Sequence, residues 1–238
     1  MFNDNNKIQK FIIPNSNYLL GVDEVGRGRL IGPVITCCVA INCNNINLLT
    51  DPPCKIDDSK KMTKKNRNAI INWINSNSNI ISYSIGSASI SEIEEYNIRN
   101  ANNLAMNRAI YNILNSTNIL SNDNILSNDN TITINIDGNY FKPDELILGN
   151  LEEYKYCKFN TIIKGDSICL PISLASIIAK EYRDDLITTL ALDKSYKYYN
   201  WQKNMGYGTK EHQQAILMHG ITIHHRLSFL QKLIKPNN

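Results

Sequence analysis

Short stretches of apolar, β-branched residues alternate along this chain with longer stretches in which apolar residues recur at helical spacing. Residues 18–25 and 33–41 are two such short apolar runs, and the glycine-containing connector 26–32 joins them. Two β-rich runs with a short connector predict an antiparallel hairpin. Three further stretches, each bounded by turn residues, also predict strands: 80–86, 131–136 and 157–164.

Helical periodicity predicts three helices between and after these strands. Thr63 is expected to be the N-cap of a helix that ends near Asn75. Residues 98–115 and 172–190 have the same kind of spacing. The remainder, 191–238, is aromatic and basic, and its pattern predicts an irregular tail. Strands interleaved with helices predict an α/β domain with a mixed central sheet.

The segment 118–129 contains the hexapeptide Asn-Ile-Leu-Ser-Asn-Asp twice in tandem. Solenoid proteins are built from units of about 20–50 residues, so this duplication is too short to form one. We interpret it as an expanded surface loop.

Length and composition narrow the class of protein. The 238 residues fit one large domain, and a net charge of +3 is compatible with nucleic-acid binding without arguing for it. None of the six cysteines belongs to a C-x-x-C pair, which argues against a zinc site and favours a reducing compartment. The sequence lacks both a secretion signal and a long apolar run. We therefore expect a cytoplasmic protein that makes no membrane contact.

Three of the expected strands lead into acidic residues beside glycine. Asp23 and Glu24 precede Gly26, and Asp137 and Asp166 follow or end later strands. Something must offset the desolvation of an acid in an apolar run. Mg²⁺ does so, and two ions about 3.5–4 Å apart can activate water for phosphodiester cleavage. For each acid alone, the alternative is the cap of a turn or helix.

The first pair of acids carries a geometric condition. Adjacent residues of a strand point to opposite faces of the sheet. Asp23 and Glu24 can therefore reach one site only where the strand bends or ends, which Gly26 permits.

Seven short motifs follow one another between about residue 18 and 230. They are Gly21-Val22-Asp23-Glu24-Val25-Gly26-Arg27-Gly28 with Gly32-Pro33-Val34, Asp58-Ser59-Lys60-Lys61-Met62-Thr63, Ile136-Asp137-Gly138-Asn139, Ile163-Lys164-Gly165-Asp166-Ser167, Ser173 to Lys180, Gly206-Tyr207-Gly208-Thr209, and His224-His225-Arg226-Leu227-Ser228-Phe229. Their order resembles that of bacterial members of the ribonuclease HII family, the type 2 ribonucleases H. Any one motif is weak, whereas seven in sequence are specific.

The resemblance implies a ribonuclease H-like fold, with a mixed central sheet flanked by helices and a helical C-terminal extension. It divides the chain into an N-terminal arm (1–17), a catalytic domain (18–190) and an extension (191–238) packed on that domain.

The resemblance also implies an endoribonuclease that hydrolyses the RNA strand of RNA–DNA hybrids. We expect it to cut 5′ to ribonucleotides embedded in duplex DNA by two-metal-ion catalysis, leaving a 3′-hydroxyl and a 5′-phosphate. Four acids would bind Mn²⁺ or Mg²⁺ and carry catalysis: Asp23, Glu24, Asp137 and Asp166. The implied substrate-binding residues are Gly26, Arg27, Gly28, Lys60, Lys180 and Tyr207. A monomer is expected, and contact with a sliding clamp is left open.

Within that set, the loop 26–28 would recognise the ribose 2′-hydroxyl through its backbone, because glycines let the main chain approach a ligand closely. Tyr207 would stack on the sugar of the neighbouring deoxynucleotide, or belong to an aromatic core or rim. Lys60 and Lys180 would contact phosphates, although Lys60 also fits a solvated loop. The adjacent pair at 224–225 lacks the i, i+4 spacing of a helical zinc site, which favours a structural role.

Two positions depart from the family pattern, and three alternative interpretations fit the sequence less well. Arg29 stands where the family usually has proline, and Met205 stands where lysine commonly precedes Gly-Tyr, a loss that Lys203 could partly replace. Ribonuclease HIII lacks the central arginine of the loop and carries an extra N-terminal domain. A non-catalytic nucleic-acid-binding module is less favoured because it would not need four acids. A structural calcium-binding domain is less favoured because the sequence contains no D-x-D-x-D-G loop.

Overall fold

The computed structural model describes residues 17–116, 132–149, 154 and 156–234; most of the predicted arm and the duplicated segment 118–129 lie outside these ranges. Within the described residues, five strands form one sheet in the order β3-β2-β1-β4-β5. The strands are β1 (Tyr18–Val25), β2 (Val34–Asn42), β3 (Ile81–Ala88), β4 (Ile132–Asp137) and β5 (Cys157–Ile162). The five strands predicted from the sequence all form.

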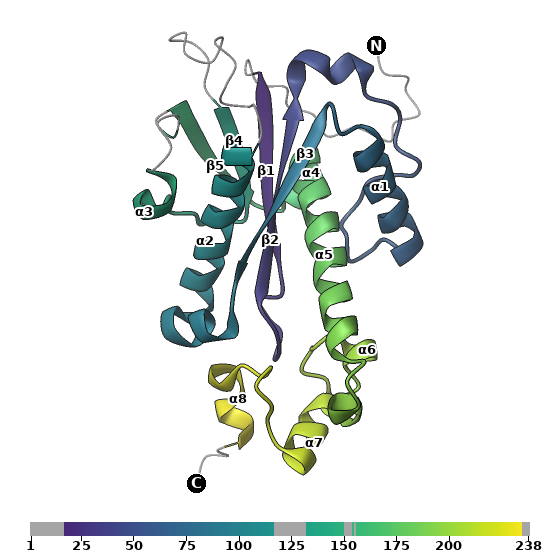
Figure 1. Cartoon of the computed structure of the whole chain (residues 1–238), viewed down its shortest axis with the longest axis vertical. Coiled ribbons are helices and arrows are strands. Elements are labelled where there is room, and N and C mark those ends of the chain that lie inside the picture. Colours follow the sequence, from purple (N-terminus) through teal and green to yellow (C-terminus); the bar gives the residue numbers. More distant parts are fainter. Residues whose placement is uncertain (1–16, 117–131, 150–153, 155, 235–238) are drawn as a thin grey trace.

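The sheet is mixed, as predicted. β1 pairs with β2 in the expected antiparallel hairpin, with Val22 opposite Cys38, and β3 continues the antiparallel half. On its other side β1 pairs in parallel with β4, with Val22 beside Ile136, and β5 is parallel to β4. The carboxyl ends of β1, β4 and β5 therefore lie at the same edge of the sheet (Figure 1).

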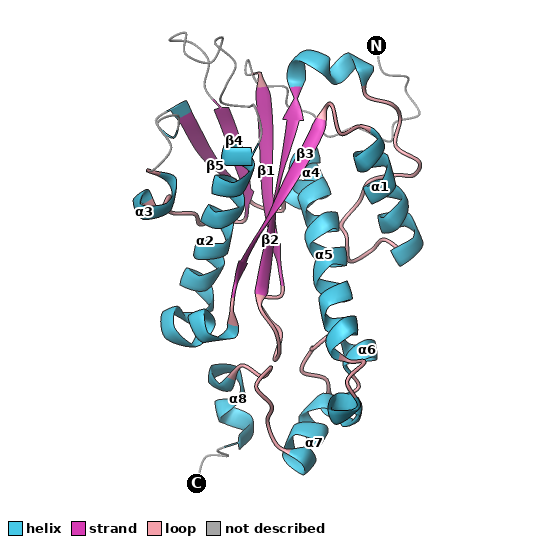
Figure 2. Ribbon diagram, viewed as in Figure 1, coloured by secondary structure: helices cyan, strands magenta, loops and turns pink. Residues whose placement is uncertain are grey.

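Helices cover both faces of the sheet (Figure 2). α2 (Ile90–Ser116) packs on one face, whereas α5 (Leu170–Leu190) and α1 (Lys64–Ser76) pack on the other. Two glycines let the long helices touch the strand backbone. A Cβ atom at Gly21 would lie 2.3 Å from the backbone nitrogen of Ile172, and one at Gly86 would lie 2.1 Å from the carbonyl oxygen of Ala105. No other residue fits at these two positions without moving a helix.

Thr63 caps α1 as predicted, since its side chain accepts a hydrogen bond from the backbone of Asn66. The prediction for α2 was incomplete, because the helix begins eight residues earlier than expected, at Ile90. The early part has a capping box in which Ser89 and Glu92 bond reciprocally. The chain then kinks at Asn97, whose φ of 64° is not helical.

The segment after α5 is helical, so the irregular tail predicted from its pattern was wrong, whereas the helical extension implied by the resemblance forms. Its elements are η3 (Lys194–Tyr199), α6 (Trp201–Asn204), α7 (Lys210–His219) and α8 (Leu227–Ile234). They lie beyond the edge of the sheet at which β1 ends (Figure 1). A separate apolar cluster, including Ile31, Ile187 and Trp201, joins this extension to the rest of the molecule.

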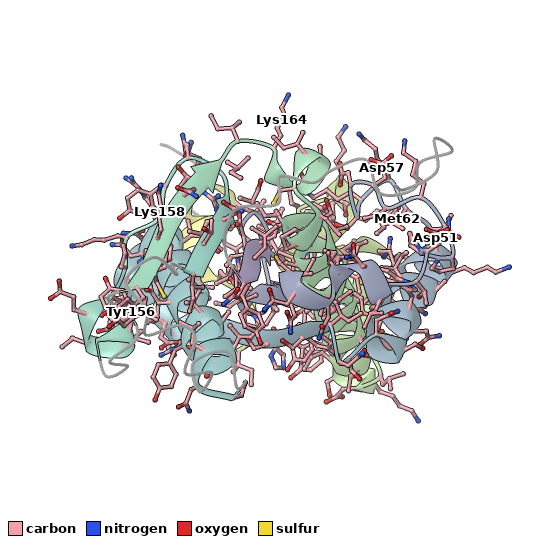
Figure 3. All side chains as sticks on the ribbon, turned by 90° about the horizontal axis from the view of Figure 1, so that it is seen from above. Asp51, Asp57, Met62, Tyr156, Lys158 and Lys164 are labelled. Carbon is pink, nitrogen blue, oxygen red and sulfur yellow. The ribbon has the colours of Figure 1, made fainter. Side chains whose placement is uncertain are left out.

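Three short elements complete the described chain: η1 (Cys43–Leu48), α3 (Glu145–Leu148) and α4 (Gly165–Ile168). In the view from above (Figure 3), Asp57 and Met62 lie on the side of α1, and Lys158 of β5 lies on the opposite side. No helix among the described residues has the length and apolar character needed to span a bilayer.

Candidate active site

The acidic residues singled out in the sequence gather at one edge of the sheet. Asp23 and Glu24 lie at the end of β1, and Asp137 is the last residue of β4. Asp166 lies in α4, which follows β5. Parallel pairing of the three strands accounts for this arrangement, because it brings their carboxyl ends together.

Asp23 and Glu24 face opposite sides of the sheet, as their adjacent positions in a strand require. Asp23 is only 6% exposed and lies near Ser176 of α5, whose hydroxyl lowers its pKa. Its Oδ1 accepts a hydrogen bond from the backbone N–H of Glu24 at 2.7 Å. The Glu24 carboxylate instead lies on the side of α2 and accepts a hydrogen bond from Nη1 of Arg27 at 3.1 Å.

Three of the carboxyl groups have raised pKa values, because their surroundings disfavour the charged form. Burial, followed by repulsion from Glu24 and Asp137, raises the pKa of Asp23 well above its usual value. Burial also raises the pKa of Glu24, although Arg27 opposes this change. The pKa of Asp137 is raised by burial and by Asp166, and it is partly restored by the backbone N–H of Gly165, which donates to its Oδ1 at 2.7 Å. Negative charge at this edge is therefore undercompensated.

These carboxylates interact electrostatically but do not share one centre. Among the described residues, no three Asp, Glu, His or Cys side chains converge closely enough to hold one ion. The Glu24 carboxylate is paired with Arg27 at 3.1 Å. The donor set nevertheless suits a divalent cation, which prefers carboxylate oxygens and would relieve the repulsion that raises these pKa values.

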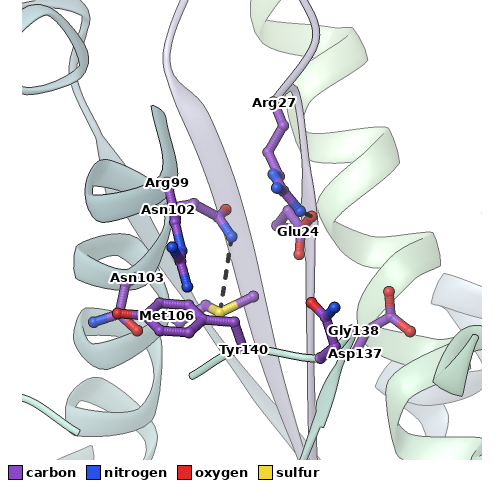
Figure 4. Close-up of a pocket in the computed structure, with 10 residues that line it drawn as sticks. Glu24, Arg27, Arg99, Asn102, Asn103, Met106, Asp137, Gly138 and Tyr140 are labelled. Carbon is purple, nitrogen blue, oxygen red and sulfur yellow. Dashed lines mark hydrogen bonds and ion pairs between the residues drawn. The ribbon is translucent and has the colours of Figure 1, made fainter. Parts of the chain in front are cut away.

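A polar pocket of about 290 Å³ opens beside the acids (Figure 4). The strand ends contribute Glu24 and Asp137 to its lining, and the kinked helix α2 contributes the opposite wall, with Arg99, Asn102 and Asn103. The Asn102 side chain is only 7% exposed, and its Oδ1 has no hydrogen-bond partner. The pocket thus places cationic and amide groups across from two carboxylates.

The geometry of the edge agrees with comparisons to known proteins. A family model described as ribonuclease HII matches residues 20–232. The chain belongs to the ribonuclease HII family. It is 42% identical to ribonuclease HII of Wolbachia pipientis subsp. Culex pipiens, and the match covers 90% of this chain and 91% of that protein. The resemblance inferred from the motifs is confirmed, and the chain is a type HII ribonuclease H, a hydrolase that acts on RNA–DNA hybrids.

Two solved structures share the fold. Ribonuclease H2 from Pyrococcus horikoshii has a TM-score of 0.58 at 23% identity, over 91% of this chain and 96% of that one. Bst-RNase HIII, solved in complex with Mn²⁺, has a TM-score of 0.51 at 14% identity, over 85% of this chain and 70% of that one. The α/β fold predicted from the sequence is thereby confirmed.

The acids Asp23 and Glu24 are followed by the loop 26–28, the glycine-arginine-glycine segment singled out in the sequence. Gly26 has a φ of 99°, and a Cβ atom there would lie 2.6 Å from Nε of Arg183. Gly28 is exposed, and a Cβ atom there would meet no atom within 4 Å. Two buried arginines bond the main chain of this loop and of the segment after it. Nη1 of Arg226 donates to the carbonyl of Arg27 at 3.0 Å, and Nη2 of Arg183 donates to the carbonyl of Ile31 at 2.9 Å.

The other predicted substrate-binding residues lie in different surroundings. Tyr207 is 46% exposed, just before α7. Lys60 is exposed in the loop before α1, and its positive charge makes a small contribution that lowers the pKa of Asp137. Lys180 is half-buried in α5, where Nζ donates to both carboxylate oxygens of Asp184 at 2.6 Å. A phosphate would have to compete with Asp184 for this lysine.

Sequence reasoning missed the buried arginines and the wall of the pocket on α2. Arg183 is 0% exposed and lies three residues after Lys180, so a charged residue on an apolar helix was the available signal. Arg226 was visible only as part of a motif. Arg99 and Asn102 carried no signal, because their relation to the acids depends on how α2 packs on the sheet.

Proposed function

We propose that this ribonuclease HII cuts the phosphodiester bond on the 5′ side of a ribonucleotide embedded in duplex DNA, in addition to RNA in RNA–DNA hybrids. The products would carry a 3′-hydroxyl and a 5′-phosphate. The observation that carries the proposal is the group of buried carboxylates with raised pKa values at the ends of parallel strands, next to an exposed glycine loop.

Four carboxylates would hold two divalent ions, Mg²⁺ or Mn²⁺: Asp23, Glu24, Asp137 and Asp166. The bound ions would supply the positive charge that activates water and stabilises the leaving oxygen. Asp137 is oriented for this task by the backbone N–H of Gly165 and Asp23 by that of Glu24. If Glu24 turns toward an ion, it releases Arg27, whose guanidinium then becomes available to a phosphate of the substrate.

The loop 26–28 would read the substrate next to these acids. Because Gly28 is exposed and has free space around it, its main chain can lie against a ribose and bond the 2′-hydroxyl that distinguishes RNA from DNA. Tyr207 would stack on the neighbouring deoxynucleotide. Lys60 and Lys180 would contact phosphates of the substrate.

The test is cleavage of three end-labelled duplexes: all-DNA, DNA with one ribonucleotide, and a continuous RNA–DNA hybrid. Each is incubated with Mg²⁺, with Mn²⁺ and with a chelator, and the product ends are identified by ligation and phosphatase treatment. We expect one cut, 5′ to the single ribonucleotide, only when an ion is added. Cleavage of the hybrid without cleavage of the single-ribonucleotide duplex would contradict the proposed substrate, and full activity in chelator would contradict the metal requirement.

A further inference from the structure

Arg29 stands where the resemblance leads one to expect proline. Its side chain is buried against Tyr207, the residue expected to stack on the substrate. Its side chain is 4% exposed, and its guanidinium lies over the face of the Tyr207 ring, well within the ~6 Å limit of a cation–π contact. Its Nη1 has no hydrogen-bond partner and is closed to solvent. No carboxylate in the described ranges forms an ion pair with it. The ring thus directly contacts this charge, and the negative charge of Asp184 also favours it.

The charges around Arg29 make that contact more important. Arg183, Arg226 and Lys180 all interact with it electrostatically, and all three are cations. Asp184 opposes them, but Lys180 already occupies both of its oxygens. Burial, followed by repulsion from Arg183, lowers the pKa of Arg29 to about 9. A buried cation among like charges destabilises the fold unless a partner compensates it.

The main chain of Tyr207 is fixed independently of its ring. Its carbonyl accepts a hydrogen bond from Nδ1 of His212 at 2.8 Å, and its N–H donates to the carbonyl of Asn204 at 2.8 Å. The preceding carbonyl, that of Gly206, accepts from the backbone N–H of Leu30 at 2.9 Å, which places the segment after Arg29 directly beside Tyr207. The backbone therefore fixes the position of the Tyr207 Cα atom, and the contact with Arg29 would determine the orientation of the ring.

We propose that Arg29 is a positioning residue, which holds the inner face of the Tyr207 ring so that the outer face is presented to the nucleotide next to the cut. This inference rests on the proposed function of Tyr207 as a stacking platform. The guanidinium would act through the ring, because it lies over the ring face and its Nη1 is closed to solvent. A ring held in this way loses no rotamer freedom when the substrate binds.

The contact can be tested without activity. Tyr207 is replaced by 3-fluorotyrosine, and its ¹⁹F resonance is compared in the protein as it stands and in Arg29→Gln and Arg29→Lys. We expect a shift and a broader line in Arg29→Gln, because the ring loses its cation and gains freedom, and a smaller shift in Arg29→Lys, which keeps the charge. A resonance that Arg29→Gln leaves unchanged would overturn the proposal, whatever the enzyme cleaves.

The functional consequence is tested by a double-mutant cycle on the single-ribonucleotide duplex. Arg29→Gln should raise KM about 10-fold, because a ring that is no longer held must be ordered when the substrate binds, while kcat stays within about twofold. In a Tyr207→Ala background the same substitution should change KM less than about twofold. Lys197→Gln is the matched control, because it removes an exposed cation that lies over Tyr198 in the same extension. It should leave KM unchanged.

Two results would overturn the positioning role. One is a KM effect that persists in full in the Tyr207→Ala background, with the slope of log KM against log salt reduced by about one, which would mean that Arg29 contacts a phosphate directly. The other is an unchanged KM for Arg29→Gln. If Arg29→Gln does not fold, Arg29→Lys and its ¹⁹F spectrum decide. Failure of the proposed function would instead appear as a native enzyme that does not cut the single-ribonucleotide duplex.

Discussion

Replacing Gly28 with alanine is the most direct test of how this enzyme reads its substrate. The new methyl group would meet no atom of the protein within 4 Å, and Gly28 does not have the positive φ that would strain alanine. The free energy of unfolding should therefore change by no more than about 0.5 kcal/mol. The same methyl group would protrude from the exposed loop toward the substrate. A displacement of about 1 Å can cost on the order of 100-fold in rate, which corresponds to about 2.7 kcal/mol of the activation barrier.

The assay measures kcat/KM of Gly28→Ala on the single-ribonucleotide duplex, with the melting temperature and the affinity for Mn²⁺ measured separately. We expect a loss of about 100-fold in kcat/KM, with both other quantities close to those of the unmodified enzyme. Gly26→Ala is the contrasting variant. At φ 99° a Cβ atom would press on Arg183, so this variant should lose stability as well as activity. A Gly28→Ala enzyme that cuts within about threefold of the original rate would refute the proposal that the loop 26–28 recognises the ribonucleotide.

Three further predictions concern the acids, a histidine pair and a buried ion pair. Asp137→Asn should lower kcat by at least about 10³-fold without lowering the melting temperature, since it removes a charge whose pKa is raised by burial and keeps the acceptor for Gly165; near-normal turnover would rule out the metal assignment. His212 and His225 are buried, and burial lowers the pKa of each to about 4. Below about pH 6.5 the unfolded chain therefore binds protons at these imidazoles that the folded chain does not bind. The free energy of unfolding should be unaffected by them above that pH and should fall by up to about 2 kcal/mol per imidazole at pH 5. Urea titrations that give equal stability at pH 7 and pH 5 would contradict this. Arg67→Ala should cost about 3–5 kcal/mol of folding free energy, because it removes the buried ion-pair partner of Glu181 and leaves only the exposed Lys64, 3.9 Å away; denaturant unfolding measures the loss, and a cost below about 1 kcal/mol would show that the pair contributes little.

Much of the fold could be predicted because its signals are local. The strands follow from β-rich runs bounded by turn residues, and the start of α1 follows from the capping side chain of Thr63. The early start of α2 could have been predicted from its capping box at Ser89 and Glu92. The kink at Asn97 also has a local signal, because Oδ1 of Asn97 accepts hydrogen bonds from the backbone N–H groups of Arg99 and Asn100, as an N-cap residue does.

The site was predictable in composition but not in arrangement. The acids could be identified from their positions at strand ends, and the opposite orientations of Asp23 and Glu24 from strand geometry. Which acids come together depends on the parallel pairing of β1 with β4, which no local pattern encodes. The helices of the C-terminal extension were missed because η3 and α6 are short and α7 has a weak apolar stripe, so tertiary contacts around Trp201 decide their form.

The pairing of β1 with β4 also has a consequence for how the enzyme is made. The hairpin of β1 and β2 joins neighbouring segments and can close early, whereas the contact of Val22 with Ile136 must wait for a distant part of the chain. During synthesis, the amino-terminal acids therefore leave the ribosome well before the strand that ends in Asp137. A chain that is still being translated, or one truncated before β4, has the loop 26–28 but not the second half of the acid cluster. We therefore expect a chain that ends before β4 to be inactive, because it lacks Asp137 and Asp166.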